Sequence, residues 1–210
     1  MSTYVLRYFP IKARAEVARI LLLASGDKFV DVMPDWPAEK SNQPLGQLPV
    51  LIETLEDGTE FELSDSIAIE KYLARKSGLL VKTGPMDTAR EDQLSFQIKD
   101  VVDMHYAYMF APEDSRKVVE AKYRSNAEAF VKYHEKILLE NGSNGHYFGS
   151  EMTYMDIALF AFITIIRQPS EKAIKDRADY FSESNAPGIN KVYETVQASS
   201  IAAPYVATLK

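Results

Sequence analysis

Residues 3–33 read TYVLRYFPIKARAEVARILLLASGDKFVDVM, and this stretch decides the fold of the first third of the chain. Residues 3–8 are rich in β-forming side chains, whereas residues 13–25 carry apolar residues at helical spacing and are followed by Gly26, a typical helix stop. Residues 29–33 alternate as a strand. A strand, a helix and a second strand in this order predict a parallel strand pair joined by a crossover helix.

A hairpin and a further helix are expected next. Residues 49–53 form a short apolar run, and residues 60–63 follow an Asp57-Gly58 turn, which together predict two antiparallel strands. Residues 66–76 have helical spacing. We therefore expect a small α/β domain over residues 1–78.

The pattern changes beyond this domain. Residues 79–85 read LLVKTGP, which predicts a linker, and every later periodic segment is helical. We expect an all-α domain over residues 86–210, with a nearly all-apolar helix over residues 154–166. That helix contains Asp156 and is too short to span a bilayer, so it is expected to be buried.

Composition narrows the classes of function. The chain has 210 residues and a net charge of −6, without the basic stretches expected for binding nucleic acid or an anionic membrane. It has no cysteine, which excludes disulfides and protein-borne thiol chemistry. The 3 histidines lack metal-ligand spacing and no Gly-rich phosphate loop occurs, so no metal or nucleotide is expected. Without a secretory signal at the N-terminus, a cytoplasmic location is expected.

Several separated motifs occur in order along the chain. They are Tyr4–Phe9, Arg14–Glu16 with Arg19, Asp35–Pro37 with Lys40, Gly46–Pro49, Leu63–Ile69, Tyr72–Arg75 and Thr153–Asp156. In these motifs the chain resembles, over essentially its whole length, the cytosolic glutathione transferase family, nearest its tyrosine-type members and the sigma class. The resemblance implies a thioredoxin-like N-terminal domain that binds glutathione and an all-helical C-terminal domain that contributes the electrophile site.

The resemblance places the catalytic hydroxyl on Tyr8; a tyrosine simply packed in the sheet is the alternative. A thiol of pKa about 8.5 is only a few per cent thiolate at neutral pH, and a hydroxyl donor aimed at sulfur favours the anion. Arg14 matches a family arginine near the sulfur, where its charge stabilises the thiolate; a surface ion pair is its alternative. Lys12 and Ala13 replace the family's usual Arg and Gly, and Ala resists the positive φ that Gly allows.

The resemblance also implies how most of the glutathione molecule is bound. Trp36, Lys40 and Gln47 match positions that bind the glycyl carboxylate, through a charge on Lys40 and an indole donor on Trp36. Leu48-Pro49 matches the family's cis-proline step, at which the Leu48 backbone pairs with the cysteinyl unit.

The γ-glutamyl end is assigned to the start of a helix. Ser66 opens this helix, where backbone N–H groups and the helix dipole favour a carboxylate. Asp65 stands where most tyrosine-type relatives have Gln, and we expect it to face the γ-glutamyl ammonium. Helix capping by Asp65 is an alternative that is compatible with this role.

The electrophile is expected between the two domains. Phe9, Met104, His105 and Tyr108 are candidates for an apolar wall, although the Met and Tyr residues could equally belong to the helix core. The resemblance further implies a homodimer, in which Asp103 or, with less support, Asp100 reaches the glutathione site of the partner.

These residues lead to one principal function and one alternative. We expect glutathione, the co-substrate, to attack hydrophobic electrophiles in conjugation, in prostaglandin-type isomerisation or in peroxide reduction. A non-catalytic ligand-binding or structural protein, such as a lens crystallin, is the alternative. An omega-type disulfide reductase needs a catalytic cysteine, which the chain lacks. Asp156 is predicted to complete a capping box with Thr153 and not to act as a catalytic acid.

Overall fold

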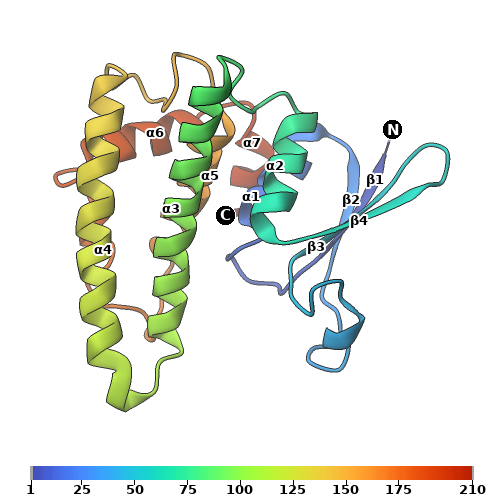
Figure 1. Cartoon of the computed structure of the whole chain (residues 1–210), viewed down its shortest axis with the longest axis horizontal. Coiled ribbons are helices and arrows are strands. Elements are labelled where there is room, and N and C mark those ends of the chain that lie inside the picture. The colour runs from blue at the N-terminus through green and yellow to red at the C-terminus, as the bar shows by residue number, and fades with distance from the viewer. Residues whose placement is uncertain (1, 210) are drawn as a thin grey trace. The chain divides into compact units, whose positions relative to one another are not determined.

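A computed structural model describes residues 2–209 of the chain (Figure 1). In chain order the elements are β1 (Thr3–Arg7), α1 (Glu16–Ser25), β2 (Lys28–Val32), η1 (Lys40–Asn42), β3 (Val50–Thr54), β4 (Glu60–Ser64), α2 (Ser66–Lys76), α3 (Pro85–Met109), α4 (Glu113–Glu140), α5 (Tyr154–Ile166), η2 (Asp179–Phe181), α6 (Pro187–Gln197), α7 (Ala203–Val206) and η3 (Ala207–Leu209). They form two compact units, one comprising the chain up to Leu80 together with residues from Ser199 onward, the other Val81–Ala198.

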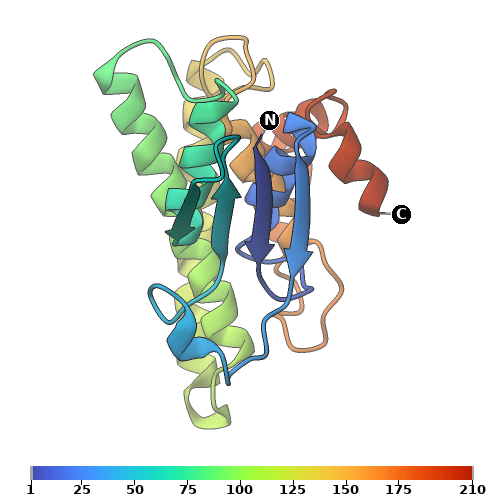
Figure 2. The same cartoon turned by 90° about the vertical axis from the view of Figure 1, so that its right-hand side faces the viewer.

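The first unit contains a four-stranded sheet in the order β2-β1-β3-β4, and Figure 2 shows its strands side by side. Strands β1 and β2 run parallel, whereas β3 pairs antiparallel with both β1 and β4. The predicted parallel pair and hairpin are therefore confirmed. At the hairpin turn, Gly58 has a φ of +83°, and the Asp57 carboxylate accepts the backbone N–H of Thr59 over 2.9 Å.

Helices α1 and α2 contact each other, and α2 also contacts β3 and β4. Leu6 of β1, Ile20 and Leu21 of α1, Leu51 of β3 and Ile69 of α2 are all fully buried. This small apolar core fixes the ends of β1 and α1, and the loop between them carries Tyr8.

The first helix begins later than predicted. Residues 13–15 form a turn, and α1 starts at Glu16 instead of Ala13. The backbone N–H of Glu16 donates to the carbonyl of Ala13 over 3.1 Å, which closes a turn, and the backbone N–H of Arg14 donates to the hydroxyl of Tyr8. The turn thereby belongs to the loop after β1 and not to the helix.

The second unit is helical, with α3 and α4 as two long neighbours in Figure 1. Every residue of α5 is buried, which confirms the predicted central apolar helix. Its predicted capping box is confirmed as well, since Thr153 and Asp156 bond to each other's backbone N–H groups. Among residues 2–209, no helix is long and apolar enough to cross a membrane.

Candidate active site

Tyr8 directly follows β1 and is held there by one further bond of the sheet. Its backbone N–H donates to the carbonyl of Val32 over 3.0 Å, which extends the pairing with β2 by one residue. Its side chain is only 4% exposed. The phenol is therefore fixed from both its backbone and its surroundings.

The Tyr8 hydroxyl accepts a hydrogen bond from the backbone N–H of Arg14 over 3.3 Å. Burial raises the pKa of Tyr8 above its ordinary value, against the opposing effects of the Arg14 bond and of the charges on Arg14 and Arg19. The phenol is consequently protonated at neutral pH, and its own proton can be donated to an acceptor. This is the state required of a hydroxyl that stabilises an anion.

An aromatic row connects Tyr8 to two of the other predicted residues. The ring of Phe9 packs edge-on against Tyr8, with centroids 5.4 Å apart, and against Trp36, with centroids 5.8 Å apart. The ammonium of Lys40 lies 5.8 Å from the Trp36 ring centroid, within the range of a cation–π contact. The structure thus brings together Tyr8, Phe9, Trp36 and Lys40, which are spread over 33 positions of the sequence.

The Leu48-Pro49 peptide bond is cis, as the family resemblance implies. Leu48 is half-buried, Pro49 is buried and Gln47 is exposed immediately before β3. A second cis bond, Trp36-Pro37, was not anticipated.

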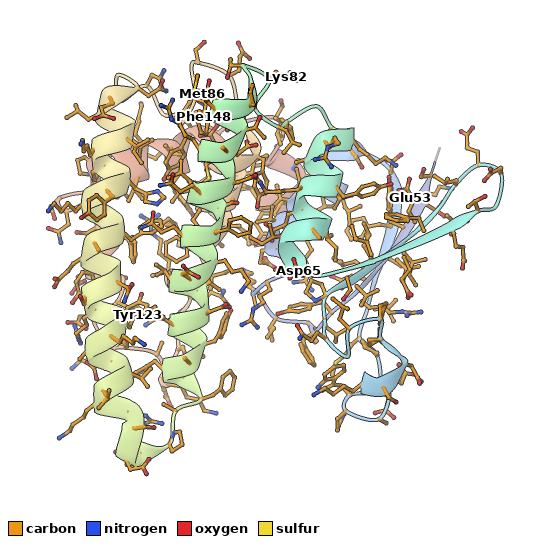
Figure 3. The ribbon with its side chains drawn as sticks, in the orientation of Figure 1. Glu53, Asp65, Lys82, Met86, Tyr123 and Phe148 are labelled. Atoms are coloured by element: carbon orange, nitrogen blue, oxygen red, sulfur yellow. The ribbon has the colours of Figure 1, made fainter. Side chains whose placement is uncertain are left out.

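Asp65 and Ser66 form the start of α2, and Figure 3 labels Asp65 at this point. The Asp65 carboxylate accepts the backbone N–H of Ala68 over 3.1 Å, so Asp65 is the N-cap. Its φ of +80° lies in a region that non-glycine residues rarely adopt. Asp65 is exposed and Ser66 is buried, which leaves the carboxylate of Asp65 in contact with solvent.

Arg19 is a site residue whose role sequence reasoning missed. Its guanidinium carbon lies 5.6 Å from the Tyr8 ring centroid, and it bonds to the backbone of the loop that follows Tyr8. The pairing of Glu16 with Arg19 at a spacing of three is a helical signal that the sequence does contain. The carbonyl partners, by contrast, have no sequence signature.

All predicted glutathione-binding residues and both predicted catalytic residues belong to the first unit. Of the predicted electrophile-pocket residues, Phe9 belongs to the first unit, whereas Met104, His105 and Tyr108 belong to α3 in the second.

The three α3 residues have different surroundings within their own unit. His105 is buried, with its ring centroid 6.1 Å from that of Tyr123, and burial followed by the charge of Arg177 lowers its pKa to about 4. Met104 and Tyr108 are half-buried, and the Arg116 guanidinium lies 5.9 Å from the Tyr108 ring centroid. His105 is thus part of the α3–α4 packing, and its role toward an electrophile stays a prediction.

The two aspartates considered for a partner's site also differ. Asp103 forms an ion pair with Lys99 on its own helix over 2.5 Å, whereas Asp100 is exposed. Among residues 2–209, no group of three or more acidic or histidine side chains is arranged to hold a metal ion.

Comparisons with known proteins agree with the fold. Residues 99–208 match the family described as glutathione S-transferase, C-terminal domain. The probable glutathione S-transferase 6 of Caenorhabditis elegans is 35% identical over 173 residues, which cover 76% of this chain and 78% of that protein. S-crystallin 4 of Enteroctopus dofleini is 29% identical over 176 residues, which cover 76% of this chain and 79% of that protein.

A solved structure shares the fold of both units. The sigma class glutathione S-transferase of Fasciola hepatica aligns with a TM-score of 0.80 at 23% identity, over 99% of this chain and 96% of that chain. The fold is therefore a thioredoxin-like domain with an all-helical domain. The chain belongs to the glutathione S-transferase family of enzymes.

Proposed function

We propose that Tyr8 activates the thiol of bound glutathione for attack on hydrophobic electrophiles. The observation that carries this proposal is the buried, protonated phenol whose oxygen already accepts the Arg14 N–H, so that its proton points elsewhere. A hydrogen bond from this hydroxyl to the sulfur stabilises the thiolate and lowers the thiol pKa. The positive charge of Arg14 acts in the same direction.

Charged groups of the first unit suit the three charges of glutathione. Lys40, packed on Trp36, would bind the glycyl carboxylate together with Gln47. Ser66, in the first turn of the eleven-residue helix α2, would bind the γ-glutamyl carboxylate through N–H groups that have no partner within the helix. Asp65 would offer its exposed carboxylate to the γ-glutamyl ammonium, and the Leu48 backbone would pair with the cysteinyl unit.

The remaining assignments extend this proposal. The helical domain after the linker would contribute Met104, His105 and Tyr108 to the electrophile site, and the first domain would contribute Phe9. The protein would work as a cytoplasmic homodimer of the sigma type. Asp103 would have to leave Lys99 to reach a partner's site, so Asp100→Asn and Asp103→Asn variants should be compared for an increased KM for glutathione.

The test is conjugation of glutathione to a dinitrohalobenzene by the wild type and by Tyr8→Phe, with glutathione binding measured by calorimetry. Removing a hydrogen bond to a charged group costs about 1.5–3 kcal/mol, so Tyr8→Phe should lose about 10- to 150-fold in kcat while still binding glutathione. Tyr72→Phe is a matched control, because it removes a tyrosine hydroxyl from a buried glutamate, Glu53, in the same unit. Equal rates for wild type and Tyr8→Phe would show that Tyr8 is not the donor.

A structural or ligand-binding role is the second candidate, favoured by the similarity to S-crystallin 4. A protein of that kind has no need of a protonated phenol beside two arginines. The same assay separates the two functions. A wild-type protein that binds glutathione but turns over neither a dinitrohalobenzene nor an organic hydroperoxide would favour the binding role.

A further inference from the structure

The C-terminal segment of the chain is hydrogen-bonded to helix α1, which directly follows the loop that carries Tyr8. Glu16, the first residue of α1, is only 2% exposed. One of its carboxylate oxygens accepts the hydroxyl of Tyr205 on α7, and the other accepts the guanidinium of Arg19. A buried carboxylate is stable only when it has both an opposite charge and further hydrogen-bond donors. The orientation of Glu16 therefore depends on the Tyr205 hydroxyl as well as on the Arg19 guanidinium.

Arg19 uses its remaining donors on the loop that follows Tyr8. It donates to the carbonyl of Ile11 over 2.8 Å and to the carbonyl of Phe9 over 3.0 Å. These carbonyls lie one and three residues beyond Tyr8, in a segment without regular structure. Because the guanidinium is a rigid planar fork, its position fixes that of both carbonyls.

Two other partners compete with this arrangement of Glu16 and Arg19: the carboxylate of Asp31, and water. Asp31 on β2 accepts the Nε of Arg19 over 2.5 Å, and it is more exposed than Glu16. A surface pocket of about 360 Å³ is lined, among others, by Glu16, Arg19, Asp31 and Tyr205. If the Tyr205 hydroxyl is removed, water from this pocket can reach the ion pair of Glu16 and Arg19. When water replaces that hydroxyl and weakens the bond between Glu16 and Arg19, the guanidinium of Arg19 is expected to move toward Asp31 and away from the loop.

We propose that Tyr205 is a positioning residue for Tyr8, acting through Glu16 and Arg19 on the loop that sets where the phenol points. This inference rests on the proposed function, because it needs Tyr8 as the donor to sulfur. The chain of contacts runs from Tyr205 to Glu16, from Glu16 to Arg19, and from Arg19 to the Phe9 and Ile11 carbonyls and the Tyr8 ring. A displaced phenol makes a weaker hydrogen bond to the thiolate, so the bound thiol becomes less acidic.

The experiment compares wild type, Tyr205→Phe, Tyr72→Phe and Tyr8→Phe. The ultraviolet absorbance of the thiolate is titrated with glutathione bound, and kcat and KM are measured across the same pH range. Tyr205→Phe retains the ring and removes only the hydroxyl. We expect it to raise the apparent pKa of the bound thiol by about 0.5–1 unit and to lower kcat below that pKa by about 3- to 10-fold, with little change in KM for glutathione.

Tyr72→Phe separates positioning from stability. It too removes a tyrosine hydroxyl from a buried glutamate of the first unit, and Glu53 retains the bond from Lys76 just as Glu16 retains the bond from Arg19. Both variants should lower the melting temperature, but only Tyr205→Phe should shift the thiol titration. An equal shift in both variants, or a wild-type titration in Tyr205→Phe, overturns the inference.

Further variants keep the test decisive. If Tyr205→Phe does not fold, Glu16→Gln replaces it, since glutamine retains the size of the side chain but removes the charge that holds Arg19; the same upward shift is expected, and its absence overturns the inference. Wild-type activity in Tyr8→Phe overturns the proposed function, and this inference with it. Loss of activity in Tyr8→Phe together with an unchanged titration in Tyr205→Phe overturns the inference alone.

Discussion

The backbone N–H of Arg14 donates a hydrogen bond to the hydroxyl oxygen of Tyr8 over 3.3 Å. The bond fixes the phenol by an atom that every residue except proline possesses. The contribution of Arg14 therefore divides into two parts, a backbone part that orients Tyr8 and a side-chain part that supplies charge. The two parts can be separated by mutation.

Arg14→Ala retains the N–H donor and removes the charge. We expect the bound thiol to become less acidic by about 0.5–1 unit, with a 3- to 10-fold lower kcat/KM near neutral pH. Because the Arg14 side chain is exposed, salt should narrow the difference from wild type. Arg14→Lys, which preserves the charge, serves as the control. An unchanged thiol titration in Arg14→Ala would leave Arg14 with the role of a surface residue.

Asp65 permits a similar separation, of capping from ligand binding. Asp65→Asn retains an oxygen for the Ala68 N–H and tolerates the φ of +80°, whereas Asp65→Ala loses the cap and is strained at that φ. The free energy of unfolding should fall by about 1–2 kcal/mol in Asp65→Ala and by less than about 0.5 kcal/mol in Asp65→Asn.

The affinity for glutathione should depend on the negative charge of Asp65 and not on its capping bond. If the carboxylate faces the γ-glutamyl ammonium, both Asp65 variants lose a charge-assisted bond, and the Kd for glutathione should rise about 10-fold or more in each. Isothermal titration provides the measurement. A wild-type Kd in Asp65→Asn would assign Asp65 to capping alone.

The sequence predicted those features whose partners are close along the chain. The crossover unit, the Asp57-Gly58 hairpin and the capping box of Thr153 and Asp156 all follow from residues within a few positions of one another. The candidate site residues were assigned from the family resemblance, because their motifs occur in the order that is typical of the family. In the structure, Tyr8, Phe9, Trp36 and Lys40 lie in contact in one row.

Features that depend on distant partners could not be predicted. Helix α1 starts three residues late, after a turn in which the Glu16 N–H donates to the Ala13 carbonyl and the Arg14 N–H donates to the hydroxyl of Tyr8. The link between Glu16 and Tyr205 spans 189 positions and has no periodic signature. Arg19 acts on backbone carbonyls, which carry no side-chain identity for a sequence to display.

His134 on α4 is expected to make the stability of the second unit depend on pH. Its Nδ1 lies 2.5 Å from the Tyr147 hydroxyl and its Nε2 lies 3.1 Å from Oε1 of Gln97. Because Oε1 only accepts, Nε2 carries the proton and Nδ1 accepts from Tyr147. Burial lowers the pKa of His134 to about 3.

The folded pKa of His134 is below the unfolded value of about 6.5, so the unfolded chain takes up the proton first as pH falls. The stabilisation is complete above about pH 6.5 and decreases as pH falls toward 3, by about 2 kcal/mol at pH 5. His134→Gln should be less stable than wild type at pH 7 but should lose about 2 kcal/mol less between pH 7 and pH 5. Urea unfolding at both pH values provides the test, with His105 common to both proteins, and parallel pH dependences would contradict it.

Asp156 stabilises more than the start of α5. Its carboxylate accepts the Thr153 N–H over 2.8 Å and the Thr153 hydroxyl over 3.1 Å, and it also accepts the buried N–H of Tyr147 over 2.8 Å. The capping bond alone contributes about 1 kcal/mol, and a buried N–H without a partner costs about 1–3 kcal/mol more. Asp156→Ala should therefore lower the free energy of unfolding by about 2–4 kcal/mol.

The matched control for Asp156→Ala is Thr153→Ala, which removes the capping hydroxyl and leaves the bond to Tyr147 in place. It should cost about 1 kcal/mol, so that the difference between the two variants measures the remaining bonds of the Asp156 carboxylate, which are those to the N–H groups of Tyr147 and Thr153 and to Nδ1 of His146. In both variants, kcat per folded molecule should equal that of the wild type, because Asp156 makes its bonds within the helical unit, whereas the chemistry proposed for Tyr8 belongs to residues of the first unit. An Asp156→Ala protein that is as stable as wild type but inactive would instead make this carboxylate part of the catalytic machinery.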